Sequence, residues 1–484
     1  MPQVDAVVVG SGPNGLAAAL TLARAGLSVQ VFEGAQTIGG GCRTAELTLP
    51  GFAHDVCSAV HPLAAASPFF RGCDLEARGV RLLTPKVAVA HPLAGGHASA
   101  IIGSVAETAS LLGADAGPYR RLMEPLVRAA DPITSMVLSA PLRSLPERLG
   151  PAARFAVQGL LPASVLARRL RTPEGRALLA GVAGHSMRPL SAPLTGAFGL
   201  TLMLLAHTTG WPVVAGGSGQ LAGALTAELA DLGATLTTGS WIGRLEELPP
   251  ARAVLLDVTP RQLLAMTGDR LPAGYRRAMR RFRYGPGVCK VDWALDGPVP
   301  WQSKACLEAA TVHVGGTFAE VAHSAAEVYA GRHPERPFCI VAQPGVVDPS
   351  RAPAGKQTLW GYCHVPAGSG LDQADRIEAQ IERFAPGFGD LILARSVRTA
   401  AEMERYDPDY VGGDISAGAA TLRQTVGRPV MRPNPYRTPL AGVYLCSAST
   451  SPGGGVHGMC GMWAAQTALR DMHMSLPDGM AGCR

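Results

Sequence analysis

Three glycines near the start of the chain have the spacing of a dinucleotide-binding turn. Gly10, Gly12 and Gly15 fit the pattern G-x-G-x-x-G. In such a turn the first glycine permits the tight bend, the second lets backbone approach a pyrophosphate, and the third lets a helix pack closely on a strand. Glu33 follows Gly10 by 23 residues, where a carboxylate can accept hydrogen bonds from both hydroxyls of an adenosine ribose. These residue types predict binding of an adenine dinucleotide.

The elements needed to position these residues follow one another in the required order. The sequence predicts a buried strand over 6–9, a helix over 14–25 and a second strand over 28–32. The free N–H groups and the positive dipole end of the helix would face the phosphates. A glycine-rich turn that binds nothing is the weaker alternative, because strand, turn, helix, strand and acid all occur together.

Two more glycine loops favour the same ligand. The segment 38–44, IGGGCRT, exposes successive backbone N–H groups, for which phosphate is the natural neighbour. Arg43 could add a charge there or cap the loop on the surface. The segment 436–471 predicts a strand over 443–446, a Ser/Thr/Gly loop and a helix from about His457. We therefore expect the two ends of the chain to meet around one extended ligand.

A further glycine cluster at 216–219 does not complete a second nucleotide site. It precedes a predicted helix over 221–232 and a strand over 235–238, but no long apolar strand comes before it and no acid follows. The sequence thus predicts one dinucleotide site and no separate nicotinamide-binding domain.

Three residues are candidates for proton handling or catalysis. Lys290 lies within an otherwise apolar predicted strand over 285–295 and must reach water, a carboxylate or a cofactor, with exposure at a sheet edge as the simple alternative. His61 belongs to a polar stretch with His54, Asp55 and Ser58. His457 opens the last predicted helix. For each histidine a satisfied structural role is the simpler interpretation.

Composition limits the class of protein. The chain has 484 residues, is 47% hydrophobic and carries a net charge of +6, almost wholly from arginine, which does not indicate nucleic-acid binding. Ten cysteines occur without a C-x-x-C pair or a secretory leader, which predicts a reducing cytoplasm, thiols that fill the core and no metal site. We expect disorder only after about His473.

Positive charge is concentrated in one segment. Residues 119–190 hold eleven arginines and four acids, a balance of +7, together with apolar helical patches at 132–140 and 155–166. Such a surface can rest on anionic lipid at the inner face of the membrane. A helical subdomain with solvated arginines explains the same residues and is the favoured interpretation. The apolar run 192–206 predicts a buried or substrate-lining helix.

The segments GSGPNG and YLCSASTSPGGGVHGMCG together resemble the phytoene desaturase and carotenoid isomerase family of flavoproteins, in the branch that resembles pyridine nucleotide-disulphide oxidoreductase domain-containing protein 2. The resemblance covers both ends strongly and the middle loosely. It implies FAD as cofactor. The residues that it implies at FAD are Gly10, Gly12, Pro13, Asn14, Gly15, Glu33, Gly40, Gly41, Arg43, Ile242, Ser449, Gly455, Val456 and His457. Flavin amine oxidases, similar in their FAD domain, carry a lysine on a comparable strand, so Lys290 is a candidate for holding a water at flavin N5.

The resemblance also implies a fold and an activity. The expected fold is α/β, with a glutathione reductase-like Rossmann domain from 1–85, 206–268 and 426–484. A discontinuous α+β substrate domain, with a helical subdomain, would take 86–205 and 269–425. The expected activity is oxidation or desaturation of an apolar, isoprenoid or lipid-like substrate, with reoxidation by oxygen or a quinone. A redox-neutral isomerase or saturase and a flavin-binding scaffold stay open, and an amine oxidase is less favoured.

Overall fold

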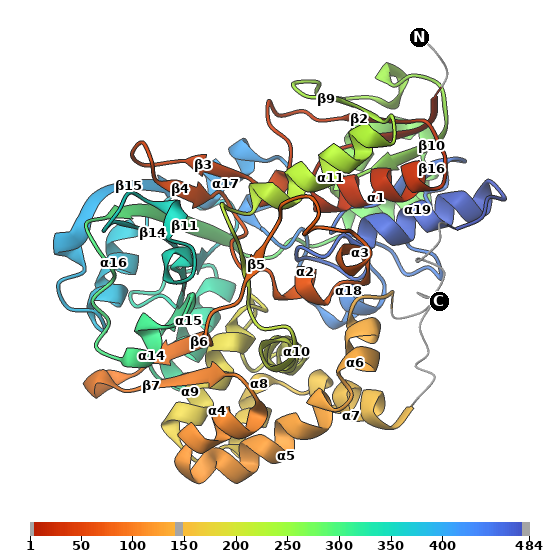
Figure 1. Cartoon of the computed structure of the whole chain (residues 1–484). Helices are drawn as coiled ribbons and strands as arrows, with labels where there is room; N and C mark the ends of the chain where they lie inside the picture. Colours follow the sequence, from red (N-terminus) through yellow and green to blue (C-terminus); the bar gives the residue numbers. More distant parts are fainter. Residues whose placement is uncertain (1–3, 141–148, 477–484) are drawn as a thin grey trace.

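Two large sheets, two small two-stranded sheets and the helices that pack on them make up the computed structural model, which describes residues 4–140 and 149–476 (Figure 1). The smaller sheet is parallel, with strand order β16-β10-β1-β2-β9. Its strands come from three distant parts of the sequence: β1 (Val4–Val9), β2 (Val29–Phe32), β9 (Thr235–Thr237), β10 (Ala251–Leu256) and β16 (Val443–Leu445). The carboxyl-terminal halves of β1 and β10 are apolar because helices and loops cover both faces of the sheet there.

Helix α1 (Pro13–Arg24) packs against α11 (Gly219–Asp231) and α19 (Met459–Asp471) on one face of this sheet (Figure 1). The contact between α1 and α19 is unusually close. A Cβ atom on Gly461 would lie 1.8 Å from the carbonyl oxygen of Asn14. A glycine near the end of the chain is therefore what lets the last helix pack on the first.

The larger sheet has the order β15-β11-β14-β13-β12-β6-β7. It is antiparallel except where β12 runs parallel to β6. The strands are β6 (Val87–Pro92), β7 (Ala98–Ile102), β11 (Gly287–Leu295), β12 (Thr311–Val314), β13 (Cys339–Ala342), β14 (Gln357–Val365) and β15 (Ile392–Arg398). Directly paired residues share a face, so Thr311, Ala342 and Trp360 form one row across three strands.

Helices cover this sheet and form the lower part of the view in Figure 1. Those around the larger sheet are α4 (Val105–Leu111), α5 (Ala116–Val127), α6 (Ala130–Val137), α7 (Leu149–Leu160), α8 (Ala163–Leu166), α9 (Pro173–Gly184), α10 (Thr195–Thr208), α14 (Lys304–Leu307), α15 (Phe318–Tyr329), α16 (Ala374–Glu382) and α17 (Ala400–Tyr406). The remaining elements are α2 (Pro62–Ala66), α3 (Pro68–Arg71), α12 (Pro260–Thr267), α13 (Ala273–Arg280), α18 (Leu422–Val426), β3 (Thr44–Glu46), β4 (Ala53–Asp55), β5 (Leu82–Leu83) and β8 (Val213–Val214).

The predicted fold class is confirmed, and most predicted elements occur within a few residues of their expected bounds. Two details differ. Strand β11 lies inside the sheet between β15 and β14, so Lys290 is not at an edge and is only 2% exposed. Helix α19 begins at Met459, after Gly458 at φ +68°, and not at His457. The predicted disorder after His473 and part of the basic segment, 141–148, fall largely outside the described residues.

Within the described ranges no helix is long and apolar enough to cross a membrane. The nine cysteines there are free, and all except Cys57 are buried.

Candidate functional site

One cavity of about 1380 Å³ joins the two sheets. Its walls come from the carboxyl ends of β1, β2 and β10, from one face of the larger sheet, and from α6, α7 and α10. Most of the predicted cofactor residues line it: Gly10, Gly12, Pro13, Asn14, Glu33, Gly40, Gly41, Arg43, Ile242, Gly455, Val456 and His457. Gly15, Ser449 and Lys290 do not. Both ends of the chain therefore meet at one cavity.

The first glycine turn has the geometry that its spacing predicts. Gly10 has a left-handed φ of +97°, and a Cβ on Gly15 would lie 2.1 Å from the carbonyl oxygen of Gly10. Gly15 thus serves helix–strand packing behind the cavity wall. A Cβ on Gly40 would lie 3.0 Å from the Cα of Gly12, so the second glycine loop rests on the first. Together they offer bare backbone to an extended diphosphate.

Glu33 lies in the cavity wall and is buried. Its Oε2 accepts hydrogen bonds from the N–H and hydroxyl of Ser11 at 2.9 and 2.6 Å, and its Oε1 accepts from the N–H of Ala35 at 2.8 Å. The carboxylate is therefore fixed in place by its own turn, and ribose hydroxyls would share these oxygens with Ser11.

Arg43 caps its loop from the inside. Its Nη2 donates to the carbonyl of Thr37 at 2.8 Å and lies 3.4 Å from Oε1 of Glu33, and its Nε donates to the carbonyl of Ile38 at 3.2 Å. The side chain is 8% exposed and lines the cavity. The sequence left two roles open for Arg43, a charge at the phosphates and a cap of its loop. The structure shows the contacts of a cap, but Arg43 is buried and does not lie on the surface.

Asp257 is a site residue that the sequence did not reveal. It directly follows β10, a strand that was not predicted, and its Oδ2 accepts the N–H of Gly15 at 2.7 Å. Burial raises the pKa of Asp257 to about 7, and the charges of Asp407 and Glu33 act in the same direction. An acid directly after the apolar run 253–256 was the available signal.

Two more acids of the cavity wall follow α17. Burial raises the pKa of both Asp407 and Asp409, and each also feels the negative charge of Glu33. Asp409 accepts the N–H of Thr259 at 2.9 Å. The carboxyl groups around the glycine turn therefore resist ionisation together.

His61 lines the cavity and has a defined tautomer. The hydroxyl of Ser218 donates to the carbonyl of Ser58 at 2.5 Å, so it must accept from Nε2–H of His61, 2.7 Å away. The Nδ1 lone pair has no partner among the described residues. Burial lowers the pKa of His61 to about 4, so the ring is neutral at neutral pH.

His457 uses both ring nitrogens on the backbone of the closing loop. Nδ1 accepts the N–H of Met459 at 3.0 Å, and Nε2 then carries the proton and donates to the carbonyl of Gly453 at 3.1 Å. Burial lowers the pKa of His457 to about 4. These contacts shape the loop and leave neither nitrogen free for proton transfer. Ser449 has a similar role, since its hydroxyl donates to the carbonyl of Ala417 at 2.8 Å.

Lys290 is buried behind the cavity wall. Its Nζ lies 2.5 Å from both carboxylate oxygens of Asp292 and 5.5 Å from the ring centre of Trp360, which lines the cavity. His54 lies on the other side, with its Nδ1 3.6 Å from Asp292 Oδ1. A role of Lys290 at the flavin stays a prediction, since no described contact joins its ammonium to the cavity. Asp55 of the same polar stretch forms a buried ion pair with Arg351 at 2.8 Å.

The part of the cavity away from the glycine turns is mainly apolar. Trp360 and Tyr362 of β14 stack with ring centres 5.6 Å apart, and Ala342 and Thr311 continue the row. The helices add Met136, Val137, Phe155, Leu160, Phe198 and Leu202. We call this part the apolar chamber. The sequence did not reveal the aromatic pair because its members are adjacent only through the period of the strand.

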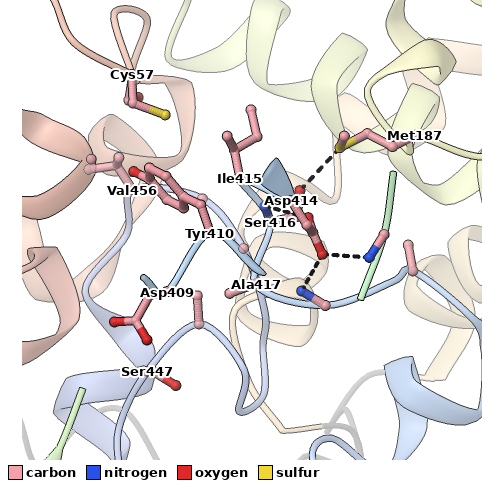
Figure 2. A pocket seen from close by; sticks show the side chains of 18 of the residues that line it. Cys57, Met187, Asp409, Tyr410, Asp414, Ile415, Ser416, Ala417, Ser447 and Val456 are labelled. Carbon is pink, nitrogen blue, oxygen red and sulfur yellow. Dashed lines mark hydrogen bonds between the residues drawn. The ribbon is translucent and has the colours of Figure 1, made fainter. Parts of the chain in front are cut away.

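The loop after α17 lines the cavity, and its residues Tyr410, Asp414 and Ser416 are shown in Figure 2. Asp414 holds it by accepting the N–H groups of Gly285, Ser416 and Gly418 at 2.6 to 2.8 Å. The hydroxyl of Ser416 lies 3.6 Å from Sδ of Met187 in the helical layer (Figure 2). The carboxylate of Asp414 thus accepts three backbone N–H groups and fixes this part of the cavity wall.

Comparison with known proteins agrees with this geometry. Residues 8–71 match the protein family described as "NAD(P)-binding Rossmann-like domain". Pyridine nucleotide-disulfide oxidoreductase domain-containing protein 2 of Rattus norvegicus is 28% identical and covers 97% of this chain and 94% of its own. Cyclohexylamine oxidase of Brevibacterium oxydans superposes with a TM-score of 0.60 at 16% identity, covering 98% of this chain and 100% of its own. The chain has the fold of the FAD-dependent amine oxidases.

The similarity to carotenoid enzymes is more limited. A 4,4'-diapolycopen-4-al dehydrogenase of Metabacillus indicus is 30% identical over 130 residues, 25% of this chain and 26% of its own. The predicted resemblance is therefore supported in part. The chain is a flavin-type oxidoreductase and is similar to the rat protein over nearly its whole length. The predicted FAD is the dinucleotide of this fold, and the two glycine loops and Glu33 fit it.

Proposed function

We propose that this protein is an FAD-dependent oxidoreductase that removes a hydride from an apolar, lipid-like substrate. The observation that carries the proposal is the continuous cavity, which runs from the glycine turns into the apolar chamber. An isoprenoid fits such a chamber, and the partial relative is named for an aldehyde of a carotenoid. An amine is less favoured because the described acidic lining residues are not available to pair with an ammonium group in the chamber. Four of them surround the glycine turns: Glu33, Asp257, Asp407 and Asp409. The carboxylate of the fifth, Asp414, already accepts three backbone N–H groups.

The chain supplies binding, orientation and a dry pocket. The turns at Gly12 and Gly40 and the N-terminus of α1 would hold the diphosphate of FAD, Glu33 the ribose, and the loop at Gly455 and Val456 the far end of the cofactor. Bound FAD supplies a hydride acceptor at flavin N5, with oxygen or a quinone as the proposed final acceptor. The stacked pair Trp360 and Tyr362 excludes water beside the substrate.

The experiment is anaerobic reduction of the FAD-loaded protein. We expect an isoprenoid alcohol or a long-chain lipid to bleach the visible flavin absorbance, and cyclohexylamine and putrescine to leave it unchanged. Bleaching by the amines alone would overturn the proposal. Turnover of the apolar compound without net oxidation would instead favour the isomerase.

We also propose that residues 119–190 contact anionic membrane surfaces, from which an apolar substrate could enter. Val157 and Leu160 on α7 are 65% and 49% exposed, and Leu160 also lines the cavity. Exposed apolar side chains beside arginines are the combination that binds a lipid interface.

A further inference from the structure

We infer that the substrate of the apolar chamber carries an oxyanion head group, such as a carboxylate, and that Arg188 binds it. This rests on the proposed apolar substrate and narrows it to an anionic amphiphile.

Arg188 is a cation in the cavity wall without a counter-ion. It belongs to the loop between α9 and α10 and lines the cavity with His185, Ser186 and Met187. No ion pair or hydrogen bond of its guanidinium is found among the described residues, and its Nε is buried without an acceptor. Its one contact of note is with the ring of Tyr329, 5.2 Å from the guanidinium carbon. A buried donor without an acceptor is costly, which favours a ligand that supplies one.

Three other arginines line the cavity, of which Arg283 is exposed to solvent and two are already satisfied. Arg43 bonds to Glu33 and to two carbonyls, and Arg428 donates to the carbonyls of Ala417 and Gly418. Burial lowers the pKa of His185, the other basic group of the loop, to about 3, so it is neutral. Arg188 is therefore the partly buried cation of the described cavity wall that has no counter-ion and no acceptor for its buried Nε.

The place of Arg188 suits the head group of an amphiphile. Tyr329 lines the cavity and is 55% exposed, so the cavity reaches the surface beside Arg188. A head group bound there would stay partly hydrated while its chain enters the apolar chamber. Planar guanidinium groups bind carboxylates through paired hydrogen bonds.

The backbone of the loop is held in an uncommon conformation. Met187 has a φ of +53°, which a side chain with a Cβ adopts at a cost, and its Sδ contacts the hydroxyl of Ser416 (Figure 2). Ser186 is 4% exposed, and its hydroxyl also has no partner in the described structure. Met187 thus lies between Ser186 and Arg188, each of which has a buried polar atom without a hydrogen-bond partner in the described structure. The basic segment 119–190, to which Arg188 belongs, would draw anions toward this mouth.

The test compares four probes on the FAD-loaded protein at neutral pH: decanoate, decanol, decylamine and acetate. Binding is followed by the change in flavin absorbance and by the fluorescence of tryptophan, since Trp360 and Trp211 line the cavity. We expect decanoate to bind at least about tenfold more tightly than decanol, the worth of one charge-assisted pair, and decylamine and acetate to bind more weakly than either.

Variants assign the effect. Arg188→Met should remove the advantage of decanoate and leave the affinity for decanol unchanged, which also shows that the chamber is intact, and Arg188→Lys should restore part of it. Arg169→Met is the charge-matched control, because Arg169 is exposed in the same basic segment and does not line the cavity. It should bind decanoate as the native protein does.

Three results would overturn the inference. If decanol binds as tightly as decanoate, or if the difference survives in Arg188→Met, the head group is not an anion held by Arg188, and the proposed apolar substrate stands. If neither decanoate nor decanol binds, the apolar substrate itself is wrong and the inference fails with it.

Discussion

The charge of Asp257 should control how tightly FAD is held. Its pKa is raised to about 7, and it lies against the turn that would bind the diphosphate. Below this pKa the carboxyl is neutral, and above it the ionised group repels the phosphates. We therefore expect FAD affinity to fall as the pH rises through about 7.

The variant Asp257→Asn isolates this effect, because the amide oxygen can still accept the N–H of Gly15. Above pH 7 we expect the variant to bind FAD more tightly than the native protein, as measured by equilibrium dialysis. At a pH far below 7 the two proteins should bind FAD with the same affinity. Glu33 and Asp407, whose charges face Asp257, remain in the variant. An unchanged pH dependence would show that another group is responsible.

Loss of Glu33 should weaken FAD by about 1.5 to 3 kcal/mol, which is the worth of charge-assisted hydrogen bonds and corresponds to roughly 10- to 100-fold in Kd. Because Glu33 also accepts from Ser11 and Ala35, Glu33→Ala should lower the unfolding temperature of the apoprotein as well. Unchanged FAD retention in this variant would contradict the ribose assignment.

Which site residues the sequence revealed depends on how local their roles are. Gly10 and Gly15 were predictable because their conformation and packing serve a turn only six residues long. Asp257 was not, because its partner Gly15 is 242 residues away in the sequence. Arg188 escaped notice because what distinguishes it is the lack of a partner, which only the folded structure shows.

At the level of elements, the crossing of α1 and α19 is the contact most sensitive to one atom. A Cβ at Gly461 would lie 1.8 Å from the carbonyl oxygen of Asn14 and 2.8 Å from the N of Ala18. We expect Gly461→Ala to lower the free energy of unfolding by about 1 to 3 kcal/mol, the usual cost of overpacking, and to weaken FAD binding.

Gly223→Ala in α11 is the matched control for chemical denaturation. A Cβ there meets nothing within 4 Å, so the substitution should stabilise the protein by about 0.5 to 1 kcal/mol through helix propensity. Equal effects of the two substitutions would mean that the backbone contact does not limit stability.

Elements with a strong pattern were predicted well, and those defined by tertiary pairing were not. The strand predicted over 28–32 and the helix predicted over 14–25 have clear apolar patterns and were found nearly to the residue, as β2 and α1. Strands β6, β7 and β12 are short and were not predicted. The interior position of β11 follows from its pairing with β14 and β15, which are distant in the sequence. Lys290 suggested an edge strand instead, because a lysine is usually exposed.

For the whole molecule, the proposed membrane contact gives a vesicle-binding prediction. The protein should sediment with vesicles that contain phosphatidylglycerol and not with pure phosphatidylcholine, and salt should weaken the binding. Val157→Glu should reduce it several-fold, because Val157 is 65% exposed on α7, the helix whose Leu160 lines the cavity. Leu393→Glu on β15 is the control, since Leu393 is 46% exposed on another element. Equal loss in both variants would contradict a specific contact through α7.

The parallel sheet has one more consequence, which concerns the order in which the protein is made. Its edge strand β16 is synthesised long after β10, on which it pairs, and the helix α19 long after α1, on which it packs. Helix α1 therefore stays uncovered on one side until α19, Met459–Asp471, has been translated. We therefore expect FAD to bind only after β16 and α19 have been synthesised and packed. A chain that ends before residue 443 should have no closed site for FAD.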